Sequence, residues 1–315
     1  MKKILVALLV FIMAFGMFGC GGSGETEDDG ATIGLIVSTL NNPFFVDLRD
    51  GAQAKADELG ATLVVLDSQD DSAIELSNME DLITQGVDVI LINPTASEAV
   101  GSAVALANEA GIPVITLDRA ANSGDVVCHI ASDNVAGGKL AGEFIIEKLG
   151  GAGKVVELEG VPGASAAIER GEGFNAAAEG KLEVVARQTA NFNRDEGMSV
   201  MENILQAQPE IDAVFAHNDE MALGAVSALQ TAGYNKDGAK VIPVFGVDAT
   251  DAAKDAIAKG SMIGTIKQDA EGMAKAITSI TQNFFGEKEK FEGIETENVV
   301  GTWRVNIPYG VYTGE

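Results

Sequence analysis

The sequence predicts an α/β protein built on two doubly wound parallel sheets. From residue 31 onward, short apolar runs rich in β-branched residues alternate with amphipathic segments of helical period. The amphipathic segments commonly end at glycine, as helices do. About ten apolar runs are present, and the helical segments fall into two similar series that divide near residue 132. One sheet is therefore expected for each series.

The order of the elements predicts how each sheet is built. A strand, a helix and a second strand in succession specify a parallel sheet with right-handed crossovers. The expected strands, in chain order, are ATIGLIVS, ATLVVLD, VDVILI, IPVITL, VVCHIA, KVVELEG, LEVVARQ, DAVFA, KVIPVFGV and MIGTIK. Helices are expected between them, for example over residues 44–60 and 134–150. A (β/α)8 barrel also alternates in this way, but the number of runs exceeds the eight strands of that fold.

The first twenty residues are typical of a secretory signal. MKKILVALLVFIMAFGMFGC places two lysines before an apolar run and ends at a small residue and a cysteine. Gly19-Cys20 predicts a lipoprotein-type processing site, with Cys20 as the lipid attachment and residues 21–30 as a flexible acidic tether. Phe18 is larger than the residue usually found there, so ordinary cleavage nearby is the alternative. Cys128 is the only other cysteine, so no intrachain disulfide is expected.

Composition limits the kinds of partner. The chain has 315 residues, of which 46% are hydrophobic and 22% charged, and this is long enough for two domains with separate cores. The formal net charge is -26, from 47 acidic and 21 basic residues. This sign opposes partners built on phosphate, so nucleic acid and anionic membrane surfaces are poor candidates as partners. Contact with a membrane is expected only through the N-terminal lipid.

Candidate binding residues lie in the segments that come after the predicted strands. In open parallel sheets, ligands bind beyond the carboxyl ends of the strands. The candidates are Asn42, Phe44, Phe45, Asn93, Asp118, Arg119, Arg170, Phe192, Asn218, Asp248 and Gln268. Each has a structural alternative; Asn42 before Pro43, for example, suits a helix N-cap with proline in the first turn.

Taken together, these side chains favour a neutral polyol. Amides, carboxylates and guanidinium groups satisfy hydroxyls that both donate and accept, and aromatic rings pack on flat C–H faces. The two arginines could instead indicate an anionic ligand. Asp118 and Asp248 balance that charge.

Other chemistries find little support in the sequence. No glycine fingerprint follows the first strand, and GGAGK precedes a strand rather than a helix. His129 lies inside a predicted apolar strand, and no cysteine or second histidine is placed to form a metal site or a nucleophile pair with His217. The acidic pairs at 70–71 and 219–220 are interpreted as residues at helix N-termini. No cofactor, metal or enzymatic activity is therefore expected.

Eight segments, taken in order, resemble the ribose-binding proteins that serve bacterial ABC importers. They are STLNNPFF, LVVLDSQ, VILINPT, PVITLDR, HIASDN, ERGEGF, NDEMALGA and MIGTIKQ. The likeness runs from about residue 31 to the late 280s. The C-terminal segment TWRVNIPYGVYTGE departs from the family, and no expectation rests on it.

The resemblance implies two similar Rossmann-like lobes joined by a three-segment hinge, with a ligand cleft between them. The N-terminal lobe would comprise residues 31–132 plus 269–297, and the C-terminal lobe residues 133–268 plus 298–315. By position, the polar candidates would hydrogen-bond the sugar. Phe44, Phe45 and Phe192 would pack against its ring, with Phe44 and Phe45 facing the cleft rather than the lobe core.

The function implied is that of an extracytoplasmic solute-binding protein. It would capture a monosaccharide, D-ribose first, by lobe closure and deliver it to an ABC transporter permease. Val247 stands where the family often has Phe, so galactose, glucose or another pentose stay open. A chemotaxis receptor is a further candidate partner, and a monomer is expected. A sugar-sensing transcription repressor shares this architecture but would begin with a basic helix-turn-helix, unlike residues 1–20.

Overall fold

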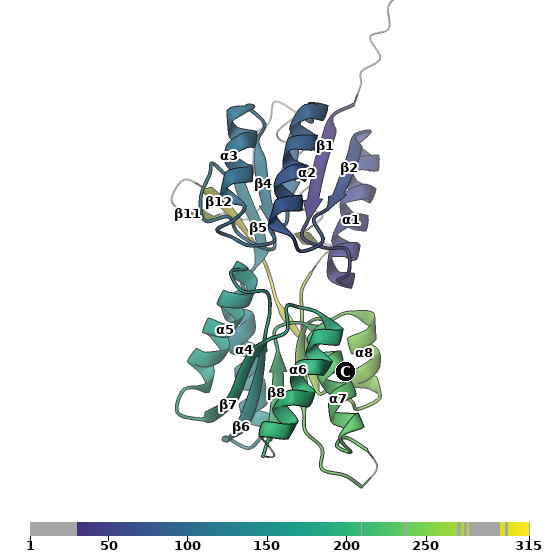
Figure 1. The fold of residues 1–315 in the computed structure, drawn as a ribbon, viewed down its shortest axis with the longest axis vertical. Helices are drawn as coiled ribbons and strands as arrows, with labels where there is room; N and C mark the ends of the chain where they lie inside the picture. The colour runs from purple at the N-terminus through teal and green to yellow at the C-terminus, as the bar shows by residue number, and fades with distance from the viewer. Residues whose placement is uncertain are drawn as a thin grey trace, which may run out of the picture.

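The chain forms two α/β lobes, one above the other in Figure 1. The computed structural model describes residues 30–208, 210–236, 238–269, 272–273, 276, 297–299 and 302–314. One lobe holds a seven-stranded sheet of order β11-β12-β5-β4-β3-β1-β2, and the other a six-stranded sheet of order β13-β10-β9-β8-β6-β7. All ten predicted apolar runs contain a strand. The predicted two-sheet α/β fold is confirmed.

The N-terminal lobe follows the predicted alternation of strands and helices. Its elements are β1 (Thr32–Val37), α1 (Pro43–Leu59), β2 (Thr62–Asp67), α2 (Ser72–Gln85), β3 (Val89–Ile92), α3 (Gly101–Glu109), β4 (Val114–Leu117), β5 (Cys128–Ser132), β11 (Glu297–Val299) and β12 (Thr302–Ile307). Strands β1 to β5 and β12 pair in parallel, and only β11 is antiparallel to its neighbour. β3 and β4 are fully buried four-residue strands, as expected for a sheet covered on both faces.

The C-terminal lobe repeats this strand order. Its elements are α4 (Asn134–Lys148), β6 (Gly153–Glu159), α5 (Ser165–Ala178), β7 (Leu182–Thr189), α6 (Arg194–Ala207), β8 (Ala213–Ala216), α7 (Asp219–Thr231), β9 (Val244–Asp248), α8 (Asp251–Ala258), β10 (Gly264–Lys267) and β13 (Gly310–Tyr312). The order β2-β1-β3-β4-β5 of the first sheet corresponds to β7-β6-β8-β9-β10 of the second. The two lobes are therefore similar, as predicted.

Both sheets are covered by helices on both faces, because alternate strand residues point to opposite sides. In β1, Leu35 and Val37 pack with α1, whereas Ile36 packs with α2 and α3. In the second lobe, α4 and α5 cover one face of the sheet, and α6, α7 and α8 cover the other. Cys128 is fully buried in the first lobe, where burial raises the pKa of its thiol to about 12. Cys128 is therefore a small residue of the lobe core.

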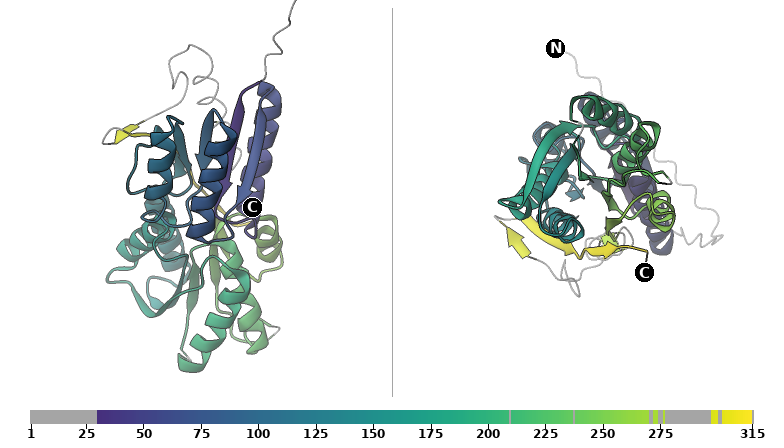
Figure 2. Two further views of the ribbon diagram at one scale, coloured as in Figure 1. Left: turned by 45° about the horizontal axis from the view of Figure 1, so that its top comes forward. Right: turned by 90° about the horizontal axis from the view of Figure 1, so that it is seen from below.

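Over the described residues, the chain crosses between the lobes at three places. The first crossing joins β5 to α4 at Asp133, and the second leaves β10 for Met273, which packs in the core of the first lobe. The third joins β12 to β13 through Pro308 and Tyr309, and Figure 2 shows this C-terminal segment, in yellow, along the edges of both sheets.

The third crossing differs from the sequence expectation. The resemblance implies a lobe boundary at residue 297, but Thr302–Ile307 pairs in parallel with β5 and so belongs to the N-terminal lobe. Val305 and Ile307 are buried there, and Pro308, which has no N–H to donate, follows the end of the strand. Assigning residues 298–299 and 302–307 to the C-terminal lobe is therefore wrong.

Three sequence predictions lie wholly or mostly outside the described residues. These are the signal segment with Cys20, the acidic tether at 21–30 except for Gly30, and the assignment of residues 269–297 to the N-terminal lobe, of which only 269, 272–273, 276 and 297 are described. Over the part of the chain that the structure describes, no helix has the length and apolar character needed to cross a membrane.

Candidate ligand-binding cleft

Ten of the eleven predicted site residues line one small chamber between the lobes. Its wall consists of Asn42, Phe44, Phe45, Asp118, Arg119, Ala166, Arg170, Phe192, Asn218, Asp248 and Gln268. The chamber measures about 10 Å³, which is close to the space for a single water molecule. The carboxyl ends of strands from both sheets meet here, as the rule for open parallel sheets predicts.

Asn42, Phe44 and Phe45 enter the chamber from the start of α1. Asn42 is the N-cap, and its Oδ1 accepts a hydrogen bond from Phe44 N at 3.0 Å. Both interpretations of Asn42, as cap and as site residue, are therefore compatible. The rings of Phe44 and Phe45 meet edge to face at 5.5 Å between centroids. Both rings line the chamber and also pack in the lobe core, so the expectation that they avoid the core is wrong.

Asp118 and Arg119 follow β4 and are almost fully buried. The Arg119 guanidinium lies between the rings of Phe45 and Phe192, with its Cζ at 5.2 and 5.1 Å from their centroids. It donates hydrogen bonds to the carbonyls of Pro94 and Thr95. Burial lowers the pKa of Arg119 and raises that of Asp118, while the charges of Arg170 and Arg119 partly offset the rise.

Asn93 is the one predicted site residue that does not line the chamber. Its Oδ1 accepts hydrogen bonds from the Ser38 backbone N and hydroxyl, and its Nδ2 donates to Leu117 O. The same Nδ2 lies 3.5 Å from Asp118 Oδ2. In this structure Asn93 therefore orients Asp118 and joins the ends of β1, β3 and β4.

Arg170 lies on α5 and is held from two sides. Its Nε donates to Asn134 Oδ1 at 2.9 Å, and its Nη1 donates to the backbone oxygen of His217 at 2.6 Å. Below it, His217 Nε2 lies 3.0 Å from Glu157 Oε1 in the buried interior of the lobe. The remaining terminal N–H groups of Arg170 can serve a ligand in the chamber.

Phe192 and Asn218 come from neighbouring loops of the C-terminal lobe. Asn218 caps α7 by accepting from Met221 N, and its Nδ2 donates to Phe192 O at 3.1 Å. Phe192 has a φ of 58°, which is unusual for a residue with a large side chain. Asp118 at 60° and Asp248 at 124° also have positive φ. Backbone strain of this kind clusters at functional sites.

Asp248 and Gln268 close the chamber beside the second crossing. Gln268 Nε2 donates to Asp248 Oδ1 at 2.6 Å. Burial raises the pKa of Asp248 to about 7, against the opposing charge of Arg170 and the bond from Gln268. Behind it, Asp219 accepts from Thr265 and Thr250, and burial together with the Asp248 charge raises its pKa.

Several buried polar atoms at the chamber have no hydrogen-bond partner among the described residues. These atoms are Asp118 Oδ1, Asp248 Oδ2, Gln268 Oε1 and Arg119 Nε. Leaving such an atom buried and unpaired costs about 1 to 3 kcal/mol. The three oxygens are acceptors and Nε is a donor, which is the combination that a molecule with several hydroxyl groups satisfies.

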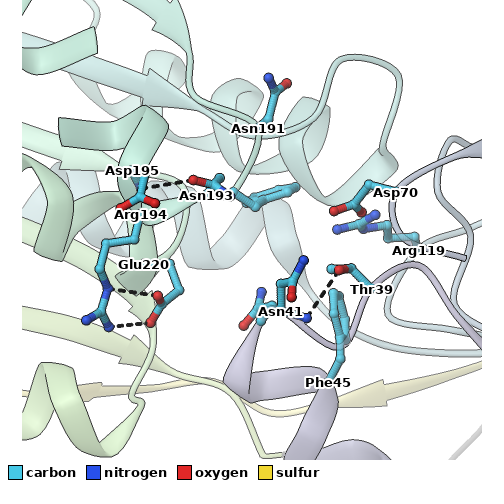
Figure 3. Close-up of a pocket in the computed structure, with 12 residues that line it drawn as sticks. Thr39, Asn41, Phe45, Asp70, Arg119, Asn191, Asn193, Arg194, Asp195 and Glu220 are labelled. Carbon is cyan, nitrogen blue, oxygen red and sulfur yellow. Dashed lines mark hydrogen bonds and ion pairs between the residues drawn. The ribbon is translucent and has the colours of Figure 1, made fainter. Parts of the chain in front are cut away.

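A larger cavity of about 560 Å³ adjoins the chamber on the outside (Figure 3). Asn42, Phe45, Arg119 and Phe192 line both spaces. The side chains that line only the outer cavity were not singled out as site residues: Thr39, Asn41, Asp70, Asn191, Asn193, Arg194, Asp195 and Glu220. Figure 3 shows Arg194 paired with Glu220 at 2.7 Å. The acidic pair at 219–220 was interpreted as a helix terminus, and only the fold reveals the ion pair.

Two facing lobes with buried, partly unpaired polar groups between them define a two-lobed solute-binding protein. The chain matches the periplasmic binding protein domain family over residues 33–289. It therefore belongs to that family, which agrees with the prediction of a binding protein rather than an enzyme. Within the described residues, no group of three His, Cys, Asp or Glu side chains could hold a metal ion.

Named relatives give a finer comparison. The chain is 57% identical to the ribose import binding protein RbsB of Haemophilus influenzae, over 86% of this chain and 89% of that protein. It is 54% identical to the protein of that name from Escherichia coli, over 82% of this chain and 86% of that one. Among solved structures, an ABC transporter solute-binding protein from Bacillus halodurans with bound myo-inositol has a TM-score of 0.80 and 34% identity, covering 92% of this chain and 96% of that one.

Proposed function

We propose that this protein is the ribose-binding component of an ABC ribose importer. The observation that carries the proposal is the chamber, where residues from both lobes surround a small space with unpaired acceptors and a donor. Relatives at 49 to 57% identity are named as ribose import binding proteins, which supports ribose as the sugar. The ten lining residues and Asn93 are proposed as the ribose site.

The mechanism that we propose is capture by lobe closure. A sugar can contact Asp118 on one lobe and Arg170 on the other only when the lobes approach each other. Its preference for the closed arrangement then shifts the population toward that arrangement. A membrane permease would bind the closed protein, and the family to which the chain belongs supports a location outside the cytoplasm.

A thermal-shift screen tests the sugar. The purified protein is heated with ribose, xylose, arabinose, allose, galactose, glucose or myo-inositol, each at millimolar concentration. A ligand at about 1,000 times its Kd adds about 4 kcal/mol to the stability of the native state. We expect a large upward shift in Tm with ribose and smaller shifts with the others. A larger shift with a hexose would reassign the sugar, and no shift with any of them would contradict the proposed ligand class.

We also propose that Cys20 carries a lipid anchor. Support comes from the sequence alone, in the apolar run of residues 1–20 and the Gly19-Cys20 junction. A Cys20→Ser variant expressed in a bacterial host should move from the membrane fraction to the soluble fraction. Equal membrane retention of parent and variant would argue against acylation at Cys20.

A further inference from the structure

The C-terminal segment places a tyrosine hydroxyl against the partner of a site arginine. Tyr309 lies in the third crossing, and its Oη donates to Asn134 Oδ1 at 2.7 Å. Asn134 Oδ1 accepts a second hydrogen bond, from Arg170 Nε at 2.9 Å. Since both groups are donors, this Asn134 atom must be the amide oxygen. The Asn134 Nδ2 donates in turn to Glu169 Oε2 at 3.2 Å, so the amide is held from three sides.

We propose that Tyr309 is a positioning residue for ligand binding, which sets the orientation of Arg170 through the side chain of Asn134. The inference rests on the proposed function, because Arg170 matters here as a sugar ligand. Asn134 is the first residue of α4, directly after the first crossing. The Asn134 amide oxygen therefore accepts a hydrogen bond from the third crossing, although Asn134 itself belongs to α4, which follows the first crossing. The hinge and the site arginine are therefore joined by two hydrogen bonds.

The surroundings of Tyr309 fit its ring closely. Its ring packs in the cluster that includes Ile145, Phe174 and Phe245. A Cβ atom on Gly137 would lie 2.9 Å from Tyr309 Cε2 and 3.0 Å from Cζ, so the glycine leaves the space that the ring fills. Burial raises the pKa of the Tyr309 hydroxyl above its usual value, which keeps it protonated and able to donate. Packing fixes the ring and Asn134 fixes the hydroxyl.

The direct test removes the hydroxyl and keeps the ring. Loss of one hydrogen bond is worth about 1 kcal/mol. We expect Tyr309→Phe to weaken ribose binding by roughly five-fold in calorimetry. Tyr312→Phe is the matched control, since Tyr312 lies on the same terminal segment and lines neither cavity. It should bind ribose as the parent does. Unchanged affinity of Tyr309→Phe would overturn the proposal.

A double-mutant cycle separates positioning from general stability. Lysine at position 170 has no Nε–H group to reach Asn134, so the hydroxyl should no longer matter in an Arg170→Lys background. We expect Tyr309→Phe to change ribose affinity less than two-fold in that background. An equal loss in both backgrounds would mean that Tyr309 acts only on the fold and would overturn the proposal.

A ligand-free readout keeps this inference distinct from the proposed function. The Nε–H resonance of Arg170 in a ¹⁵N-labelled sample, assigned by its loss in Arg170→Lys, should shift in Tyr309→Phe and stay in place in Tyr312→Phe. If the parent binds no ribose but the resonance shifts, the proposed sugar is wrong and the positioning role stands. If the resonance is the same in parent and Tyr309→Phe, the positioning role is wrong whatever the ligand.

Discussion

Phe45 and Phe192 stand on opposite lobes, yet the same guanidinium lies between their rings. The Arg119 Cζ is 5.2 Å from one centroid and 5.1 Å from the other. Cation–π contacts of a buried guanidinium are worth roughly 2 kcal/mol. A sugar can pack on these ring faces only after Arg119 moves or the lobes separate. We therefore expect Arg119 to exchange its ring contacts for hydrogen bonds to the sugar.

Removing one of these rings should weaken sugar binding. We expect Phe192→Ala to cost roughly 1 to 3 kcal/mol of ribose affinity, because apolar contact with the sugar face is lost. Titration calorimetry on the parent and variant measures the difference. Phe192→Leu is the control, since it keeps apolar volume but loses the flat ring, and it should fall between the two. Affinity equal to that of the parent in Phe192→Ala would remove the ring from the site.

Asp248 should make stability depend on pH. Burial raises its pKa in the folded protein to about 7, above the ordinary value of 3.8 for an aspartate side chain. Between these two pH values the folded state binds more protons at this carboxyl than the unfolded state does. The contribution of Asp248 to stability is therefore full below about pH 4 and is lost as pH rises toward 7.

The measurement compares urea unfolding of sugar-free parent and Asp248→Asn at pH 5 and pH 8. We expect the parent to lose more stability than the variant between these two values. The ribose affinity of the parent should rise between pH 5 and pH 8, because an ionised Asp248 accepts hydrogen bonds from sugar hydroxyls better than a neutral one does. Parallel pH profiles for both proteins would contradict this prediction.

At the scale of the elements, the start of α1 serves both the fold and the site. Asn42 caps the helix through Phe44 N and also lines both cavities. Asn42→Ala should lower the free energy of unfolding by about 0.5 to 2 kcal/mol and weaken ribose binding as well. Asp71→Ala is the control, because Asp71 caps α2 in the same way but lines neither cavity. It should lower stability alone; a loss of affinity in both variants would show an indirect effect.

The elements also show what the sequence could predict. Ten strands could be predicted from apolar runs, because helices cover both faces of each sheet. The chamber could be predicted from one rule, that residues after parallel strands converge at one edge of the sheet. It is lined by residues as distant in the sequence as Asn42 and Gln268. The place of β12 was missed, since pairing with β5 depends on contacts far along the chain. The bond from Tyr309 to Asn134 spans 175 positions, and no local pattern marks it.

At the scale of the whole molecule, the two lobes are joined directly by hydrogen bonds beside the cleft. Ser97 N donates to Gly163 O at 3.0 Å, and Ser165 N donates to Ser97 Oγ at 3.1 Å. The Ser165 hydroxyl accepts in turn from Ala120 N at 2.9 Å. Helix α5 has no side-chain cap of its own, so a serine of the other lobe satisfies its first N–H group. These bonds exist only while the lobes are together.

Ser165 should therefore affect affinity without contacting the sugar. Ser165→Ala removes the acceptor for Ala120 N, and a lost hydrogen bond of about 1 kcal/mol would lower ribose affinity roughly five-fold. Small-angle X-ray scattering should show a drop in radius of gyration with ribose, reached at higher sugar concentration in the variant.

Ser227→Ala, on the exposed side of α7, is the control and should match the parent. Parent-like affinity in Ser165→Ala would mean that contacts between the lobes add nothing to closure, and that the sugar alone holds the lobes together.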